Sequence, residues 1–369
     1  MNQRLQTRLK TIRYGGLAWC LAFALVWFPP HSTTSWPALL HFTLSICLYD
    51  GFLTLVELSH TALLSEMTTH SQERAKFNSY SAVLAGLGSF SSFFGQYSYS
   101  KQDLTQFRAI MLLISLGCAL AFVLSTHVLS KRTSTASSPL DPKKPQRGNP
   151  VGAFLFALRK HYNFWIFCLV SALQTFDCAF EKTSFVFMLD AMAPHTGTEL
   201  RGLVVSLSFF LPWLATFLLT KQIQRRGVGQ CISAVLFTRL TVCVVLSQQP
   251  NWMLLLLNRV LSELVCRLTP LVLADLVDED RFLNQREASE TKAASVIGTL
   301  QFFTKITSSL GPMLTFSLMT TQTPPLYSSW MMAVPLACVS AQMWLWQRNL
   351  YLYRDHDYYA KVKHYVEGV

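Results

Sequence analysis

Long apolar runs alternate with short polar connections along most of the chain. The run 109–130 (AIMLLISLGCALAFVLSTHVLS) is one of many that come close to or exceed the roughly 20 residues a helix needs to cross the hydrocarbon layer. The pattern predicts ten membrane-spanning helices, near residues 13–30, 37–65, 78–98, 108–130, 162–189, 201–220, 229–247, 252–274, 294–319 and 327–347.

The composition agrees with lipid as the solvent of these helices. The chain has 369 residues, of which 51% are hydrophobic and 14% are charged, whereas soluble domains carry about 25% charged residues. Because isolated strands cannot satisfy their backbone polar groups in lipid, a helical bundle is expected. The sequence therefore predicts an all-α, polytopic integral membrane protein with about ten transmembrane helices, surrounded by membrane lipid.

The basic residues indicate how the chain is oriented. Most Lys and Arg fall in alternate connections, and the opposite set of connections holds only Lys101, Arg108 and Arg201. By the positive-inside rule, both termini are expected on the cytoplasmic side. The same distribution explains the net charge of +11 without nucleic acid as a partner. A signal peptide in the first 30 residues is the alternative, but no small-residue cleavage site follows its apolar core.

One polar segment divides the chain. Residues 131–150 (KRTSTASSPLDPKKPQRGNP) are rich in Lys, Arg, Ser and Pro and are expected to form a cytoplasmic linker. Residues 1–130, with four spans, would form a shortened first half, and residues 151–347, with six spans, a full second half. Residues 348–369 are expected to be a cytoplasmic tail.

A local motif occurs in both halves. The second span ends in TALLSEMTTHSQERAKFNSYSA (61–82), and the eighth ends in LVLADLVDEDRFLNQREASETKAAS (271–295). Each has a small residue before an acid (Ser65-Glu66; Ala274-Asp275) and then a polar connection with adjoining charges (Glu73-Arg74; Arg286-Glu287). Repeats of this kind are typical of transporters built from two related halves. The second half has three spans before the motif and the first half has one, so two spans are expected to be missing.

These motifs resemble the major facilitator superfamily, and within it the glycoside-pentoside-hexuronide cation symporters typified by the sodium–melibiose symporter. The stretch Thr54-Leu-Val-Glu57-Leu-Ser59-His60-Thr-Ala62-Leu63 is similar to the fourth-helix signature of that family, and Asp275-Leu-Val-Asp278-Glu-Asp280 to its tenth-helix signature. The stretches CLYDGFLTLVEL (47–58) and DLVDED (275–280) are most similar to the transmembrane protein 180-like orphan branch of that family. The family's first two helices, which supply other cation carboxylates, have no counterpart here.

Several ionisable residues fall inside the predicted spans, where an unpaired charge costs a few kcal/mol at least. Asp50 and Glu57 are seven residues apart and share one helix face. The resemblance places Glu57 at a cation-coordinating position and gives Lys305 a position where family members keep a polar or basic residue. The residues expected to line a cation or substrate pathway are Glu57, Asp50, Asp177, Arg259, Glu263 and Lys305. Each could instead form an interhelical contact that only fixes packing.

On the eighth span, Arg259, Glu263 and Arg267 step by four and form one charged stripe. One arginine charge is left over, so a carboxylate on another helix, Glu57 or Asp177, is expected to approach it. By the resemblance, a second set forms salt bridges of an inner gate, namely Glu73, Arg74, Asp275, Asp278, Asp280, Arg286 and Glu287. The alternative for these loop acids is a solvated helix cap.

Catalytic and metal-binding motifs are not recognisable in the sequence. The nine cysteines show no CxxC spacing, and GLGSFS (86–91) lacks the third glycine of a dinucleotide loop. No enzyme activity, cofactor or metal site is expected, although Na⁺ or H⁺ could serve as a coupling ion. Two functions remain open. One is a secondary carrier for a sugar or lipid-like organic solute; the other is a membrane scaffold that keeps the transporter fold.

Overall fold

A computed structural model describes residues 2–28, 36–68, 70–98, 103–135, 158–192, 198–285, 293–321 and 324–367. All regular secondary structure in these residues is helical. Ten long helices coincide with the ten predicted spans, which confirms the predicted fold class. They are α1 (Asn2–Val26), α2 (Trp36–Met67), α3 (Ser71–Ser98), α4 (Thr105–Thr135), α6 (Tyr162–Met192), α7 (Thr198–Arg226), α8 (Val228–Gln248), α9 (Trp252–Leu283), α10 (Ala293–Thr321) and α11 (Pro324–Asn349).

Six of these helices are long and apolar enough to cross a membrane by length and composition alone: α1, α2, α4, α6, α7 and α8. The remaining four are long but more polar in the segments described. In α9 the reason is plain, because Arg259, Glu263 and Arg267 interrupt its apolar sequence. Such charges need partners inside the bundle, since lipid offers none.

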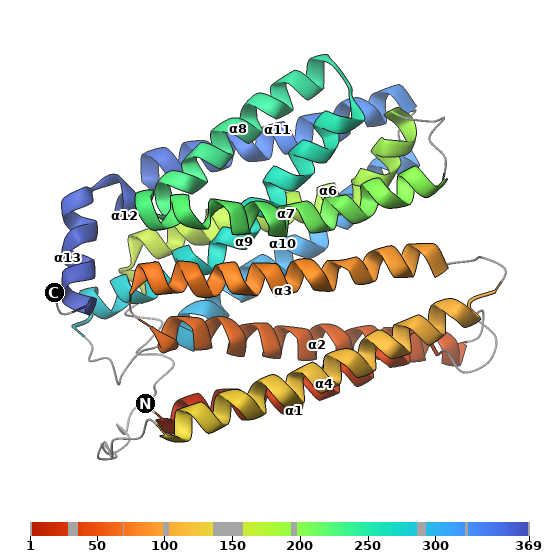
Figure 1. Ribbon diagram of the computed structural model, residues 1–369. Helices are drawn as coiled ribbons and strands as arrows, with labels where there is room; N and C mark the ends of the chain where they lie inside the picture. The colour runs from red at the N-terminus through yellow and green to blue at the C-terminus, as the bar shows by residue number, and fades with distance from the viewer. Residues whose placement is uncertain are drawn as a thin grey trace. The chain divides into compact units, whose positions relative to one another are not determined.

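The chain divides into two compact units. Unit 1 comprises Met1–Met67 and Ser91–Gly148, and unit 2 comprises Thr68–Phe90 and Asn149–Val369. The first part of α3 thus groups with the second half of the chain. Within unit 1, α1 packs against both α2 and α4 (Figure 1). Leu9, Ile12 and Leu63 form a small buried core there, and the Ser115 hydroxyl on α4 donates to the Cys20 carbonyl on α1 at 2.8 Å.

Unit 2 is built around α6 and α9. Helix α6 packs against α9, α10 and α11, and α9 also contacts α7 and α8 (Figure 1). Because both helices are surrounded, 15 of the 31 residues of α6 and 20 of the 32 residues of α9 are buried, including charged ones. Gly227 joins α7 to α8 with a φ of 83°, a conformation that a residue without a Cβ adopts readily.

The predicted tail has regular structure of its own. Two short helices, α12 (Tyr351–Arg354) and α13 (His356–Glu367), follow α11, and α13 packs beside the C-terminal end of α9 (Figure 1). Tyr359, Val362, Lys363 and Val366 recur at the spacing of one helix face. This segment therefore belongs to unit 2. Most of the predicted linker, from residue 136 onward, lies outside the described residues.

Candidate functional site

Four charged side chains meet at the end of unit 2 that carries α13, and we call them the terminal cluster: Arg74, Asp275, Asp278 and Lys363. Arg74 on α3 donates two hydrogen bonds to the Asp278 carboxylate on α9, at 2.6 and 3.0 Å. Lys363 on α13 lies 2.8 Å from Asp275 and 3.0 Å from Asp278. Two positive and two negative groups are thus brought together from three segments that are distant in sequence.

The terminal cluster is held in place by further hydrogen bonds. The Arg74 Nε donates to the Thr68 carbonyl at 2.9 Å, and the hydroxyls of Tyr353 and Tyr359 donate to Asp275 at 2.8 and 3.2 Å. Burial and the neighbouring Asp275 raise the pKa of both tyrosines. Both tyrosines therefore remain donors at neutral pH.

Electrostatics keep Arg74, Asp278 and Lys363 charged. Burial alone would raise the pKa of Asp278, but the Arg74 guanidinium and the Lys363 ammonium outweigh it, so its pKa is lowered. Burial opposes the charge of Lys363 as well, but Asp275 and Asp278 raise the pKa of that ammonium group. The terminal cluster is thus a neutral set of paired ions rather than a set of neutralised acids.

Glu279, the next residue on α9, behaves differently. Its carboxylate accepts hydrogen bonds from Asn163 on α6 and, at 2.7 Å, from Tyr358 on α13. The His161 Nε2 lies 3.7 Å away. Burial raises the pKa of Glu279 from its ordinary value of 4.5 to about 7, and these hydrogen bonds only partly oppose the shift. Glu279 is therefore a group that can change charge near neutral pH.

A second charged network lies in the middle of the helices of unit 2. Arg239 on α8 forms ion pairs with Asp177 and Glu181 on α6, the latter at 2.8 Å. Asn258 on α9 donates to the same Glu181 oxygen and accepts from the Arg239 Nε at 3.3 Å. Two acids therefore share one arginine, with all of these side chains buried. Asp177 pairs with Arg239 and not, as expected from the sequence, with the stripe on α9.

The stripe on α9 continues this network. The two carboxylate oxygens of Glu263 form ion pairs with different arginines. One lies 2.8 Å from the Arg259 Nη2, and the other lies 3.2 Å from the Arg267 Nη2. Arg267 also lies over the Trp213 ring on α7, 3.8 Å from its centroid. In formal charges, the excess positive charge of the stripe and the excess negative charge of the Asp177–Glu181–Arg239 group balance.

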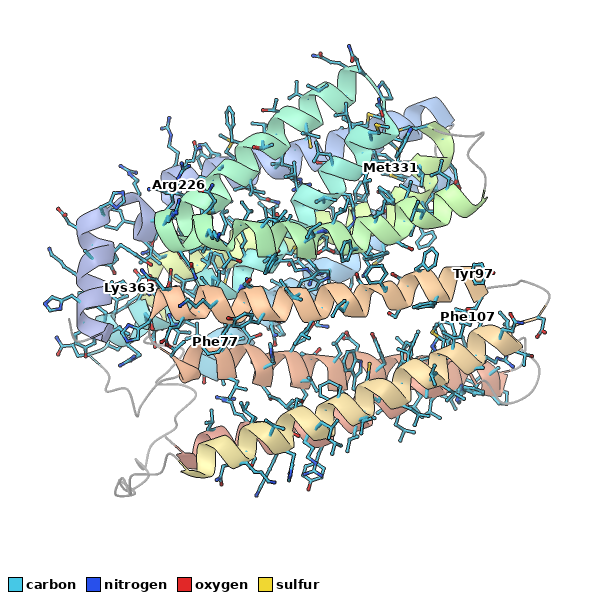
Figure 2. The ribbon with its side chains drawn as sticks, viewed as in Figure 1. Phe77, Tyr97, Phe107, Arg226, Met331 and Lys363 are labelled. Carbon is cyan, nitrogen blue, oxygen red and sulfur yellow. The ribbon has the colours of Figure 1, made fainter. Side chains whose placement is uncertain are left out.

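Two of these charges border a small cavity of about 20 Å³. Glu181, Asn258 and Arg259 form its polar side, and the lining is otherwise mostly apolar. Figure 2 places Met331, which lines the cavity, and Lys363 of the terminal cluster at opposite ends of unit 2.

A cysteine pair lies next to the stripe. The sulfurs of Cys178 on α6 and Cys266 on α9 are 2.8 Å apart, and they form with Glu263 the group of described residues that could hold a metal ion. Both Glu263 oxygens already bind arginines. A metal would therefore have to displace one of them.

The remaining predicted residues are spread over the fold. Asp50 and Glu57 are exposed on α2 in unit 1, and Lys305 is partly exposed on α10 in unit 2. Glu73 is exposed in the first turn of α3 and accepts from the Thr68 hydroxyl. Asp280 is buried and accepts from Asn284 at 2.9 Å, as a residue near a helix end does. Arg286 and Glu287 lie outside the described residues.

The sequence-based prediction did not include the residues that the tail adds to the terminal cluster. Lys363 and Tyr359 lie on the one face of α13 that carries apolar residues at helical spacing. That spacing was visible in the sequence and is the signal that could have found them. Asn163 gave no such signal, because its role depends on where α12 begins: its Oδ1 accepts from the backbone N–H of Tyr351, the first residue of α12, at 2.9 Å.

Known proteins share this sequence pattern and this fold. A model of the family described as MFS/sugar transport protein matches residues 14–323. The chain is 28% identical to mouse (Mus musculus) transmembrane protein 180 and 29% identical to its chicken (Gallus gallus) counterpart, over 84% and 93% of its own length. It spans 63% and 66% of the length of these relatives.

Among solved structures, the fold is similar to that of the major facilitator superfamily transporter FucP in the outward conformation. The TM-score is 0.57 at 13% sequence identity, and the match covers 96% of this chain and 85% of that one. At this level of identity the likeness concerns the fold alone.

Proposed function

We propose that this chain, which belongs to the MFS/sugar transport protein family, is a secondary-active transporter that moves an organic solute by alternating access and couples it to a cation or proton. The resemblance to the major facilitator superfamily and to the transmembrane protein 180-like branch is confirmed. The chain is an integral multi-pass membrane protein, and its family and fold are those of transporters rather than enzymes. Symport, the coupling ion and the solute belong to the proposal.

The observation that carries the proposal is the terminal cluster, whose buried and paired charges support its assignment as a gate. Arg74 and Asp278 are 2% and 1% exposed, so both have lost most of their hydration. For such pairs the cost of desolvation nearly offsets the attraction between the charges. The pair can therefore separate into water at small net cost when this end of the protein opens. A closed gate that opens reversibly requires this balance.

The proposed coupling site is in unit 1. Asp50 and Glu57 lie on one face of α2, and both side chains are exposed. In a membrane protein such acids are expected to face water or a partner rather than lipid. We assign Glu57 to the coupling cation, Na⁺ or H⁺, with Asp50 as its neighbour along the pathway. Asp177, Arg259, Glu263 and Lys305 are the proposed pathway residues of unit 2.

Uptake by the protein reconstituted in liposomes tests the proposal. Because the family description names sugar transport, the panel should include sugars as well as lysolipids and small zwitterions, each with and without an imposed Na⁺ or pH gradient. Glu57→Gln should abolish the dependence on the gradient. Asp103→Asn is the matched control, since Asp103 is an exposed acid at the start of α4.

Two results would contradict parts of the proposal. If the rate of uptake is unchanged both by the imposed gradients and by Glu57→Gln, the assignment of Glu57 to the coupling cation is wrong. If a well-folded preparation, extended to the full length of the relatives, takes up no solute at all, the function is that of a scaffold which keeps the transporter fold to bind partners.

A further inference from the structure

Glu181 and Arg259 line the same cavity in unit 2, and each has one unused hydrogen-bonding atom. Among the described residues, the Glu181 Oε2 and the Arg259 Nη1 have no hydrogen-bond partner, although both atoms are buried. The two residues are 5% and 1% exposed. A buried carboxylate oxygen or guanidinium N–H without a partner is costly, so both atoms require a partner that the protein itself does not supply.

One atom of each group is fixed by neighbouring side chains. The Glu181 Oε1 accepts from Arg239 at 2.8 Å and from Asn258. The Arg259 Nη2 donates to Glu263 at 2.8 Å. The unused acceptor and the unused donor are therefore held in position before any ligand arrives, which lowers the entropic cost of binding.

The lining beyond these charges is apolar and deformable. It includes Phe185, Met188, Leu255, Met331 and Met332. The cavity of about 20 Å³ exceeds the roughly 10–15 Å³ needed by one water, so as it stands it has room for about one water, and a larger ligand requires the lining to move. Methionine side chains adapt their shape easily, and they can move aside for a small polar head and an apolar group attached to it.

We infer that this cavity binds a small zwitterion with an apolar side chain, of the chemical class of neutral α-amino acids. Its carboxylate would accept from Arg259, and its ammonium group would donate to Glu181. A neutral sugar offers several hydroxyls but no charge for either group, and a simple cation or anion satisfies only one of them. The inference rests on the proposed transport function and names the class of its solute.

Equilibrium binding of radiolabelled L-leucine to the purified full chain in lipid nanodiscs tests the inference without any transport. Two analogues each lack one charge: 4-methylpentanoate has no ammonium group, and isopentylamine has no carboxylate. Because a charge-assisted hydrogen bond contributes more than a neutral one, each analogue should compete at least about tenfold more weakly than leucine, equivalent to about 1.4 kcal/mol. The inference would be overturned if either analogue competed as strongly as unlabelled leucine. It would also be overturned if D-glucose competed and neither analogue did.

Variants locate the site. Glu181→Gln and Arg259→Lys should each weaken leucine binding by about tenfold or more. Met188→Trp, which fills the cavity without changing a charge, should abolish binding even if the charge variants fold poorly. The control is Asp190→Asn, because Asp190 forms an exposed pair with Arg201 on α7 at the end of α6.

Binding that survives Met188→Trp would place the ligand elsewhere, and no leucine binding at all would mean that the cavity holds only a structural water. Both results overturn the inference. They do not bear on transport, which the uptake panel decides separately. Leucine binding without any uptake would overturn the transport function and keep this site.

Discussion

Arg74 near the start of α3 and Asp278 near the end of α9 form a bidentate ion pair, with hydrogen bonds of 2.6 and 3.0 Å. The two residues are 204 positions apart in sequence. Their pairing connects the beginning of one long helix to the end of another within unit 2. Since both side chains are almost fully buried, neither can be satisfied by water when its partner is removed.

Arg74→Met should therefore be strongly destabilising. It leaves Asp275 and Asp278 with Lys363 as their remaining ion-pair partner among the described residues. Removing one partner of a buried pair costs about 3–5 kcal/mol, and the midpoint of thermal unfolding in nanodiscs should fall accordingly. The exposed pair Arg201–Asp190, at 40% and 47% exposure, is the control. Arg201→Met should cost no more than about 1 kcal/mol, and equal effects of the two changes would contradict the assignment.

The tail helix should depend on one lysine. Lys363→Met preserves the apolar stem but removes the ammonium group that bridges Asp275 and Asp278. We expect α13 to detach more often, so that backbone amides in 356–367 exchange with deuterium several-fold faster than in the parent protein. Lys361→Met is the matched control, since Lys361 lies two residues away on the same helix and is exposed. If both variants exchange alike, Lys363 does not hold the tail.

Docking of the tail should weaken as the pH rises through the titration range of Glu279. In the docked state its pKa is about 7 because of burial, compared with an ordinary value of 4.5. Undocking that exposes Glu279 to water returns its pKa toward the ordinary value, and the docked form then binds up to one proton more, so raising the pH favours undocking. The full difference is at most about 3 kcal/mol, complete near pH 7 and absent below about pH 4.5.

Hydrogen exchange of α13 as a function of pH, corrected for the intrinsic rate, measures this dependence. Glu279→Gln keeps the acceptor for Tyr358 but cannot ionise, and it should give a flat profile between the two pH values. A profile of unchanged slope in that variant would assign the titration to another group.

The sequence predicted the helices well for a physical reason. Lipid demands an uninterrupted apolar run for each crossing, so the ten runs mark the ten long helices within a few residues in most cases. The largest difference is at α1, which begins at Asn2 rather than near residue 13. Its early turns are polar, and a polar helical turn outside the membrane leaves no mark in an apolar pattern.

Partners across helices could not be predicted in the same way. Which acid meets Arg239 depends on how α6, α8 and α9 pack, and the charge pattern of one helix does not contain that information. The stripe of Arg259, Glu263 and Arg267 was visible because its members lie on one helix. Asp177 was expected to approach that stripe and pairs with Arg239 instead.

A close approach of two helices in unit 2 gives the last prediction. A Cβ on Gly311 of α10 would lie 2.5 Å from the backbone nitrogen of Phe180 and 2.8 Å from the backbone oxygen of Phe176, both on α6. Backbone atoms of a packed helix cannot move aside singly, so Gly311→Ala should push the two helices apart. Overpacking of this kind costs about 1–3 kcal/mol or more, measurable as a lower midpoint of thermal unfolding.

The control for this change is a glycine in a helix with open space around it. A Cβ on Gly202 of α7 would meet nothing within 4 Å, and alanine is the better helix former by about 1 kcal/mol. Gly202→Ala should therefore be neutral or slightly stabilising.

Because α6 carries Asp177 and Glu181, the Gly311 variant should also disturb their pairing with Arg239. Adding Arg239→Gln to Gly311→Ala should then cost less than the sum of the two single changes. Strict additivity would show that the α6–α10 contact does not position the charged network.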